Sequence, residues 1–428
     1  MKILINGGKI IDPSQKLNKK ADILIENGKI IDMQSAINVN ADEIILADNK
    51  IVTPGFIDMH THLREPGRED VETVETAVRA AVKGGFTTVC AMPNTNPACD
   101  SQADVKFLFE KAKEAGKSKV LPIGTITKAR EGKYLSEMRE LKEAGCPAVS
   151  DDGDSVENAE LMRRAMEYAS MIDLLIISHC EDKQLAGDGV MNEGYFSTVL
   201  GLAPMPAEAE STIVERDIQL AELTGVRLHI AHVSTAKSVE IIRLAKKRGV
   251  KVTAEVTPHH FSLSDENIKT FDANFKVNPP LRSNEDIKAL KEGLKDGTID
   301  VIATDHAPHL ENEKEKEFNY APFGMIGLET ALSLSVQNLI DEKYLDWPGL
   351  IQKLTANPAN ILKYDGGSLK IGKTADIIVI APEKKWIYEK ENIQSKAVNS
   401  PFIGKKMKAF VQDVICGGKR VVKDGQII

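Results

Sequence analysis

An alternation of eight short apolar runs with helix-like segments constrains the fold of this chain more than any other feature. The runs cover residues 56–60, 87–92, 120–124, 148–152, 174–179, 227–232, 251–256 and 300–305. Segments with helical periodicity lie between them: 71–83, 103–115, 136–144, 159–168, 207–224, 238–247 and 285–295. Strands that alternate with helices form a parallel sheet covered by helices, and eight repeats predict a (β/α)8 barrel of the TIM type. Leu174-Leu175-Ile176-Ile177 is apolar throughout, as is typical of a strand buried on both faces.

The two ends of the chain show a different pattern, with short strand-like runs separated by turns. In residues 1–54, Asn27-Gly28 lies between two such runs, which is a β-hairpin signal. Residues 366–428 have the same texture around Gly417-Gly418. We therefore predict one small β-sandwich domain assembled from residues 1–54 and 366–428, beside a barrel domain of residues 55–365. The alternative is two unrelated caps.

Charge and cysteine content exclude several function classes. The chain has 428 residues and a formal net charge of −8, and no basic stripe stands out, which argues against nucleic-acid binding. The five cysteines form no Cys-x-x-Cys pair and are odd in number, as expected of reduced thiols in a cytoplasmic protein. The N-terminus lacks the pattern of a signal peptide, and no run of about 18 apolar residues predicts a membrane span.

Metal-binding residue types gather at the C-terminal ends of the expected strands, the face that carries the active site in barrel enzymes. His60 and His62 are two residues apart at the end of the first strand, so both imidazoles point to one face. Taken alone, such a pair is as often a solvated histidine pair as half of a metal site. Other strands end in further candidates, and the full set of candidate ligands is His60, His62, Asp152, His179, His232 and Asp305.

Imidazole and carboxylate ligands without thiolates favour zinc, with manganese, cobalt or iron as substitutes. Six ligands exceed what one tetrahedral ion uses, so we predict two ions bridged by Asp152, an arrangement that makes a hydroxide nucleophile at neutral pH. Asp151 points to the opposite side of the strand and is predicted to be structural. Asp305 is placed to accept a proton and pass it to a leaving nitrogen; the alternative is an N-cap that starts a helix.

Polar residues beyond the strand ends are candidates for substrate binding. Arg64 follows the histidine pair and is suited to grip a carboxylate through two parallel hydrogen bonds. Taken alone, a polar residue in such a place is more often a cap or a surface residue. The predicted substrate-binding residues are Arg64, Asn94, Asn278, His309, Pro322, Phe323 and Gly324.

The remaining histidines and one charged stretch are predicted to have roles other than metal binding. Residues 310–319 carry closely spaced charges directly after the eighth strand, which predicts a mobile lid over the site. Four histidines have the wrong strand parity or lie beyond a strand end, and they are predicted to support the structure rather than to bind metal: His229, His259, His260 and His306.

Several sequence blocks, taken together, closely resemble the signatures of dihydroorotases. The two strongest are Asp58-Met59-His60-Thr61-His62-Leu63-Arg64-Glu65-Pro66-Gly67 and Ala303-Thr304-Asp305-His306-Ala307-Pro308-His309 with Lys314. Five others follow that family's order: Met92-Pro93-Asn94-Thr95, Ser150-Asp151-Asp152-Gly153, His179-Cys180-Glu181, His232-Val233-Ser234-Thr235 and Asn278-Pro279-Pro280-Leu281-Arg282. The match spans nearly the whole chain and resembles the longer, type I dihydroorotases of the amidohydrolase superfamily.

The resemblance implies the zinc-dependent, reversible interconversion of (S)-dihydroorotate and N-carbamoyl-L-aspartate in pyrimidine (UMP) biosynthesis. It implies that metal-bound hydroxide attacks the cyclic amide carbonyl while Asp305 acts as general acid and base. It assigns one zinc to His60 and His62, and the other to His179 and His232, with Asp152 as the bridge.

The same resemblance implies roles for substrate-binding residues and partners. Arg64, Asn94 and His309 would hold the substrate carboxylate, and Asn278 would contact the ring amide. Family members are commonly dimers and some dock with aspartate carbamoyltransferase, so a homodimer and such an association are expected.

Two departures bear on the alternatives. Hydantoinases and the shorter dihydroorotases bridge their metals with a carboxylated lysine on the fourth strand, whereas residues 147–152 contain no lysine. Thr61 replaces the usual aliphatic residue and is expected to face away from the metals. The alternatives are another cyclic amidohydrolase, such as an allantoinase or a hydantoinase, and an inactive dihydroorotase-like scaffold subunit. The scaffold would be expected to have lost ligands, and all six are present.

Overall fold

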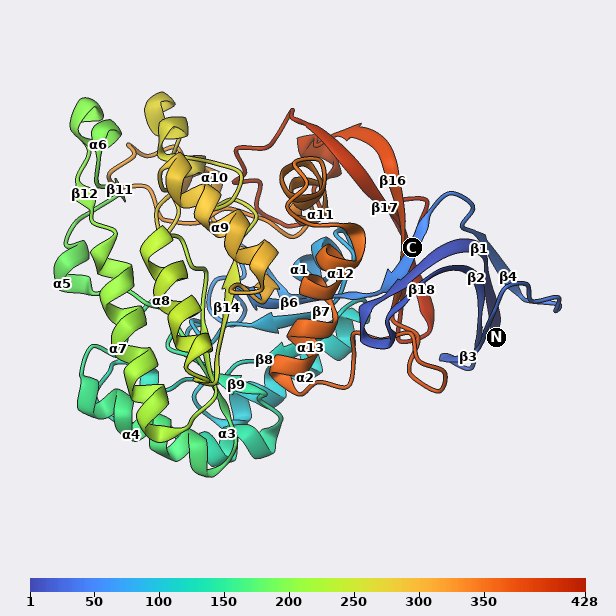
Figure 1. Cartoon of the computed structure of the whole chain (residues 1–428), viewed down its shortest axis with the longest axis horizontal. Helices are drawn as coiled ribbons and strands as arrows, with labels where there is room; N and C mark the ends of the chain where they lie inside the picture. The colour runs from blue at the N-terminus through green and yellow to red at the C-terminus, as the bar shows by residue number, and fades with distance from the viewer.

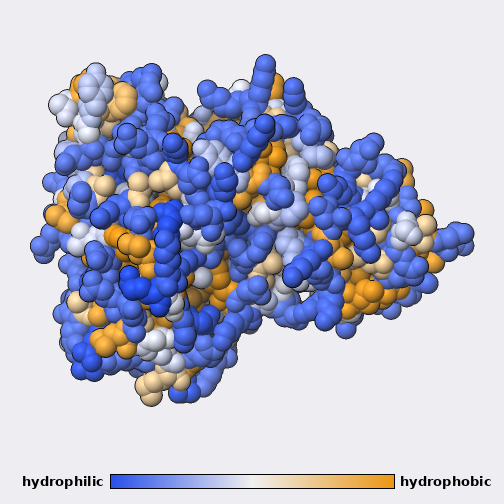
Figure 2. Space-filling model, in the orientation of Figure 1, coloured by the Kyte–Doolittle hydropathy of each residue, from blue (hydrophilic) through white to orange (hydrophobic).

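The computed structural model describes all 428 residues, and it comprises an α/β part and a sheet built from both ends of the chain. Figure 1 shows the α/β part on the left and the terminal sheet on the right, beside which both termini lie. The face drawn in Figure 2 is mostly hydrophilic, with scattered hydrophobic patches. None of the helices has both the length and the apolar character needed to cross a bilayer.

The terminal sheet has nine strands. Five come from the N-terminal end: β1 (Lys2–Asp12), β2 (Leu17–Glu26), β3 (Lys29–Gln34), β4 (Glu43–Leu46) and β5 (Ile51–Pro54). Four come from the C-terminal end: β16 (Ile377–Ile387), β17 (Lys406–Cys416), β18 (Lys419–Lys423) and β19 (Gln426–Ile427). The two groups meet where β5 pairs antiparallel with β16, with Val52 opposite Val379. The expectation that both ends build one β unit is therefore confirmed, and the two ends are not separate caps.

The hairpin expected at Asn27-Gly28 joins β2 to β3. Asn27 and Gly28 have φ of 50° and 78°, the left-handed values that a tight two-residue hairpin turn requires at both positions. The same turn lies against the turn of the β17–β18 hairpin, where a Cβ on Gly418 would come within 2.1 Å of Gly28 Cα. Two glycines therefore allow the two ends of the chain to make close backbone contact.

The middle of the chain contains eight parallel strands, and each overlaps one of the eight expected runs. They are β6 (Phe56–Thr61), β7 (Phe86–Ala91), β8 (Lys119–Pro122), β9 (Ala148–Val149), β10 (Leu175–Ser178), β13 (Leu228–Ile230), β14 (Val252–Val256) and β15 (Val301–Ile302). They form the sheets β6-β7-β8 and β9-β10-β13-β14-β15. Isolated parallel bridges link Gly124 to Val149 between the two sheets, and Thr61 to His306 between their outer ends.

Helices follow most of these strands, and all seven expected helical segments are helical. The main helices are α1 (Val74–Lys83), α2 (Gln102–Ala115), α3 (Met138–Ala144), α4 (Ala159–Met171), α7 (Glu208–Thr224), α8 (Ala236–Lys247), α9 (Asn284–Asp296), α12 (Trp347–Leu354) and α13 (Ala356–Leu362). Shorter helical turns are η1 (Pro13–Gln15), η2 (Lys128–Arg130), α5 (Lys183–Ala186), α6 (Tyr195–Leu200), η3 (Asp265–Thr270), η4 (Ala273–Phe275), α10 (Glu311–Lys314), α11 (Ala331–Ser335), the π-helix η5 (Val336–Ile340) and η6 (Lys390–Asn392). Two short strands, β11 (Met191–Asn192) and β12 (Pro204–Met205), pair with each other.

Local chemistry sets where the helices begin, and strand periodicity sets what they cover. Helix α1 begins at Val74 rather than at residue 71 because the Thr73 side chain accepts the amide hydrogen of Thr76 and caps the helix. Along the strands, alternate residues enter two different cores. Val89 and Ile176 pack in the core shared with the helices, whereas their neighbours Cys90 and Ile177 pack in a second cluster among the strands. Both strand faces are buried, which explains the uniformly apolar runs.

Candidate metal centre and substrate pocket

A polar cavity of about 370 Å³ opens at the C-terminal ends of the parallel strands. Its lining contains all seven predicted substrate-binding residues and every predicted metal ligand except His60, which lies fully buried behind them. The fourteen lining residues are His62, Arg64, Asn94, Asp152, Gly153, His179, His232, Asn278, Asp305, Ala307, His309, Pro322, Phe323 and Gly324. Residues more than 240 positions apart in the sequence therefore meet in one place.

One half of the ligand cluster joins the first strand to the last. His62 Nε2 lies 2.9 Å from Asp305 Oδ1 and 3.5 Å from Asp152 Oδ2. His60 Nε2 lies 3.2 Å from Asp152 Oδ1 and 3.6 Å from Asp305 Oδ1. Ligand atoms of His60, His62 and Asp305 all lie within 4.8 Å of one another, close enough to hold one ion.

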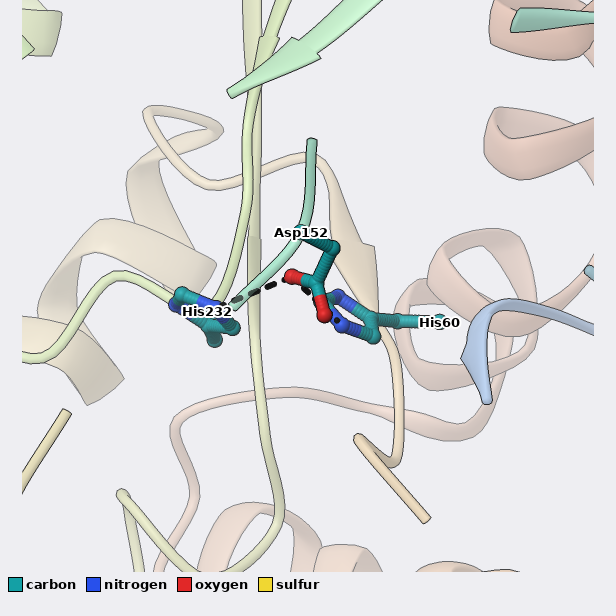
Figure 3. Close-up of side chains that lie close together, drawn as sticks. All are labelled: His60, Asp152 and His232. Carbon is teal, nitrogen blue, oxygen red and sulfur yellow. Dashed lines mark ion pairs between the residues drawn. The ribbon is translucent and has the colours of Figure 1, made fainter. Parts of the chain in front are cut away.

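The other half is built on the fifth and sixth strands. His179 Nδ1 faces His232 Nε2 at 2.9 Å, and each of these nitrogens lies 3.7 Å from Asp152 Oδ1. Figure 3 shows Asp152 between His60 and His232, with its carboxylate directed at both. Asp152 therefore contacts both halves of the cluster, the position that a bridging carboxylate needs.

Hydrogen bonds on the far sides of the imidazoles indicate that the cluster fits cations. Nδ1 of His60 donates to Glu255 at 2.7 Å, and Nδ1 of His62 donates to Asn94 Oδ1 at 2.8 Å. Burial lowers the pKa of His62, so its Nε2 carries a lone pair toward Asp305. A lone pair facing a carboxylate is unfavourable unless a cation lies between them.

Orphaned polar atoms support the same conclusion. His60 Nε2 and Asp152 Oδ1 are buried and have no hydrogen-bond partner, as expected of atoms that bind an ion. Asp152 and Glu255 also raise the pKa of His60 well above its usual value, despite burial, which acts in the opposite direction. The cavity is thus negative where the imidazoles converge. The donor set of imidazoles and carboxylates suits zinc and related first-row metals.

Three site residues have left-handed backbone conformations that residues with a side chain seldom adopt. Arg64, His232 and Asp305 have φ of 61°, 30° and 48°. Such strain clusters at functional sites because the surrounding structure has to hold it. One such restraint is Asp58, whose carboxylate accepts hydrogen bonds from the Thr304 hydroxyl at 2.6 Å and from the His60 amide at 3.1 Å. Asp58 thus ties the segments that carry His60 and Asp305.

The substrate side of the cavity has positive charge at one wall. Arg64 Nε donates to Pro308 O at 3.1 Å, and Arg64 Nη2 donates to His309 Nε2 at 3.3 Å. Burial, together with the charges of Arg64 and Lys314, lowers the pKa of His309 to about 2, so His309 is neutral. Burial lowers the pKa of Arg64 only to about 10, so it stays charged at neutral pH. This wall offers a cation beside neutral polar groups, which suits a carboxylate.

The lining also includes Asn278, whose Nδ2 donates to Glu181 Oε2 at 2.5 Å while its Oδ1 is buried without a partner. Glu181 also lies 3.6 Å from His179 Nε2. The sequence interpretation assigned no role to Glu181 or to Glu255. A signal for Glu255 was present, because a carboxylate in the apolar run 251–256 has to be paired when the strand is buried.

Residues expected to be structural lie outside the cavity lining. Asp151 Oδ1 accepts the amide hydrogens of Ile126 and Thr127, at 2.8 and 3.0 Å, and so points away from the ligands. His260 bonds Thr257 Oγ1 and Pro279 O, at 2.7 and 2.8 Å. Asp305 starts no helix, since the next helix, α10, begins at Glu311, and the N-cap alternative is therefore wrong.

The stretch 310–319 is packed in this structure. Glu313 pairs with Arg68 at 2.9 Å, and Lys314 and Phe318 are buried. Glu313 also lies 3.7 Å from His309 Nδ1, so the stretch lies beside a residue of the cavity lining. Its movement as a lid stays a prediction.

Comparison with known proteins identifies close relatives over the whole length. Residues 49–238 match the family model "Dihydro-orotase-like". The chain is 51% identical to a dihydroorotase of Geobacter metallireducens, over 99% of this chain and 100% of that protein. It is 49% identical to a dihydroorotase of Acetivibrio thermocellus, over 99% of each chain.

Solved structures show the same fold at much lower identity. The L-hydantoinase (dihydropyrimidinase) of Arthrobacter aurescens superposes with a TM-score of 0.89 at 24% identity, over 100% of this chain and 97% of that one. A dihydropyrimidinase from Brevibacillus agri gives 0.87 at 22% identity, over 100% of this chain and 96% of that one. At such identities the likeness concerns the fold alone.

Proposed function

This chain belongs to the dihydroorotase family, and we propose that it interconverts (S)-dihydroorotate and N-carbamoyl-L-aspartate in pyrimidine (UMP) biosynthesis. It is a hydrolase that acts on a cyclic amide C–N bond. The observation that carries this conclusion is a single cavity lined by five of the six predicted ligands, with His60 buried behind them, beside Arg64 and His309. That arrangement offers metal ligands and a carboxylate-binding cation within one substrate-sized space.

We propose two zinc ions per subunit. His60 and His62 would hold the first, His179 and His232 the second, and Asp152 would bridge them. The orphaned Nε2 of His60 and Oδ1 of Asp152 support this assignment. When bound, the ions would polarise the amide carbonyl and lower the pKa of a water molecule.

Asp305 is the proposed general acid and base. Surrounding imidazoles lower its pKa below the usual value despite burial, so the carboxylate is ionised and can accept a proton. It would take a proton from the attacking water and return it to the ring nitrogen as the C–N bond breaks. Its position 2.9 Å from His62 Nε2, at the cavity wall, supports this transfer and a contact with the first ion.

The substrate would lie with its carboxylate on Arg64, His309 and Asn94. Asn278 would bond the ring amide through its partner-free oxygen. The backbone at Pro322, Phe323 and Gly324 would form the remaining wall.

We further propose that the eight parallel strands close into a (β/α)8 barrel, supported by the bridges Gly124–Val149 and Thr61–His306. The barrel would comprise residues 55–365, with residues 1–54 and 366–428 forming a β-sandwich domain. A homodimer and association with aspartate carbamoyltransferase are proposed from the family resemblance alone. Five free, buried thiols support a reducing compartment such as the cytoplasm.

A substrate panel tests the proposed function. Purified protein with its metal content measured by elemental analysis would be assayed with dihydroorotate, allantoin and hydantoin. We expect turnover of dihydroorotate only, in both directions, by protein that contains zinc. Turnover of hydantoin or allantoin instead would favour the other cyclic amidohydrolases, and neither metal nor activity would favour the inactive scaffold.

A further inference from the structure

Two buried lysines, Lys276 and Lys314, lie directly behind the cavity wall formed by Pro322, Phe323 and Gly324. The two residues are 2% and 6% exposed, and both ammonium groups make their hydrogen bonds to backbone carbonyls. Buried charges are normally paired with an opposite charge, because desolvation is costly. Two buried lysines side by side at the edge of a substrate cavity, without carboxylate partners, therefore point to a role in the cavity.

Lys314 holds the wall from one side. Its Nζ donates to Pro322 O at 2.8 Å and to Gly324 O at 2.9 Å, with Lys276 O a further 3.4 Å contact. Both near acceptors belong to residues that line the cavity. Removal of the Lys314 ammonium would take a hydrogen bond from each of these two carbonyls. The backbone conformation of the cavity wall therefore depends on Lys314.

Lys276 holds the same segment from its other end. Its Nζ donates to Phe318 O at 2.8 Å and to Asn319 O at 3.0 Å, and it lies 4.5 Å from the centre of the Phe323 ring. Its own carbonyl accepts the Gly324 amide hydrogen at 2.8 Å. Residues 318–324 are thus fixed by two ammonium groups.

Burial lowers the pKa of Lys276 to about 8. Burial and the neighbouring charge of Lys276 lower the pKa of Lys314 to about 7, so both ammonium groups are charged at about pH 6. Their positive charge reaches the cavity. Lys314 contributes to lowering the pKa of His309, which bonds Arg64 at 3.3 Å. Arg64, Lys276 and Lys314 therefore concentrate positive charge on one side of the cavity. The electric field of buried charged groups is weakly screened by solvent, so such groups attract an anion without contacting it.

We propose that Lys276 and Lys314 are positioning residues that fix residues 318–324 as the cavity wall and supply positive potential for the ligand's carboxylate. This inference rests on the proposed function, because it takes the ligand to be a cyclic amide with one carboxylate. Under this proposal Arg64 contacts the carboxylate, whereas Lys276 and Lys314 attract its charge without contacting it.

The test compares two ligands that differ chiefly in charge, since the ester adds one methyl group. Orotate carries the carboxylate, and orotate methyl ester is neutral at the same position. Calorimetry at about pH 6, where both lysines are protonated, gives the Kd of each ligand for wild-type protein and for Lys314→Met, whose side chain is of similar length but uncharged. We expect the ratio of ester Kd to orotate Kd to fall by about tenfold in the variant, since one unit charge contributes roughly that much for a separation of about 10 Å and an effective dielectric constant of about 20. A purely structural role would weaken both ligands alike.

Lys353→Met is the matched control. Lys353 is also buried, and its ammonium also bonds a backbone carbonyl, Ile299 O at 2.7 Å, but it lies on α12 outside the cavity lining. Its variant should keep the wild-type ratio. If Lys314→Met does not fold, Lys276→Met carries the test, because its ammonium bonds the same segment.

An unchanged ratio in a folded, metal-containing variant at Lys276 or Lys314 would overturn the inference. Turnover of dihydroorotate by the wild-type protein is measured separately. An active wild type with an unchanged ratio contradicts only this inference, whereas an inactive wild type contradicts the proposed function.

Discussion

Glu255 accepts a hydrogen bond from Nδ1 of His60 at 2.7 Å, and both residues are fully buried. This contact fixes which imidazole nitrogen carries the proton and directs Nε2 toward Asp152. The other oxygen of Glu255 lies 3.1 Å from His229 Nε2. Burial alone would raise the pKa of Glu255, but the facing His60 and His229 outweigh it and lower the pKa to about 2. An ionised carboxylate thus supports a predicted metal ligand from behind.

Glu255→Gln should weaken metal binding without removing a ligand. A neutral amide can still accept from His60 but no longer supplies the charge, so we expect metal affinity to fall by about 10–100-fold. The measurement is metal content after dialysis against graded chelator concentrations, which needs no activity assay.

Asp413→Asn provides the comparison for Glu255→Gln. Asp413 is also a buried carboxylate, paired with Arg420, but it lies on β17 in the terminal sheet. Its variant should lose stability and retain metal. Equal loss of metal in both variants would show that Glu255 acts only through general stability.

The strands and the convergence of the candidate ligand residues were predictable because both depend on short-range patterns. Strand periodicity placed His60 and His62 on one face, and the common direction of parallel strands placed Asp152 and Asp305 at the same edge. The hairpin at Asn27-Gly28 was predictable for the same reason, since the turn chemistry is local.

What could not be predicted depends on contacts between distant residues. The partner of Glu255 lies 195 positions away, and the carbonyls held by Lys276 lie 42 and 43 positions away. Neither pairing leaves a periodic signal. The apolar pattern predicts a start of α1 at residue 71, three residues before its actual start at Val74, because it does not account for the helix cap at Thr73.

Asp305→Asn should lower kcat by about 10²–10⁴-fold, because the amide cannot take up and return a proton. The residue keeps its size, so substrate KM should change much less. Asp151→Asn is the matched control, since Asp151 is a buried carboxylate on the same face of the molecule that bonds Ile126 and Thr127 instead. Steady-state kinetics with measured metal content checks both. Near-normal kcat in metal-containing Asp305→Asn would contradict the acid–base role.

Lys353 should make stability depend on pH above neutrality. Burial lowers its pKa from 10.5 to about 8 in the folded protein. Between these two values the unfolded chain binds more protons, so the contribution of Lys353 to stability rises with pH and is flat below about 8. Denaturant unfolding at about pH 7.5 and about pH 10 should show a smaller rise for Lys353→Met than for wild type. The exposed Lys106→Met variant should keep the wild-type rise, and equal slopes in all three proteins would contradict the assignment.

Alanine substitutions at Gly418 and Gly417 distinguish the cost of backbone strain from the cost of a steric clash between the two chain ends. Both have positive φ, 79° and 59°, so alanine at either position costs about 1–2 kcal/mol in the folded state. Only Gly418 also lies against Gly28, where a Cβ would come within 2.1 Å of Cα, while nothing lies within 4 Å at Gly417. We expect Gly418→Ala to lose about 1–3 kcal/mol more unfolding free energy than Gly417→Ala. Chemical denaturation measures the difference, and Gly28 cannot move freely because its carbonyl accepts the Ala375 amide hydrogen at 2.9 Å. Equal losses in the two variants would mean that the contact between the hairpins of the two chain ends does not stabilise the sheet.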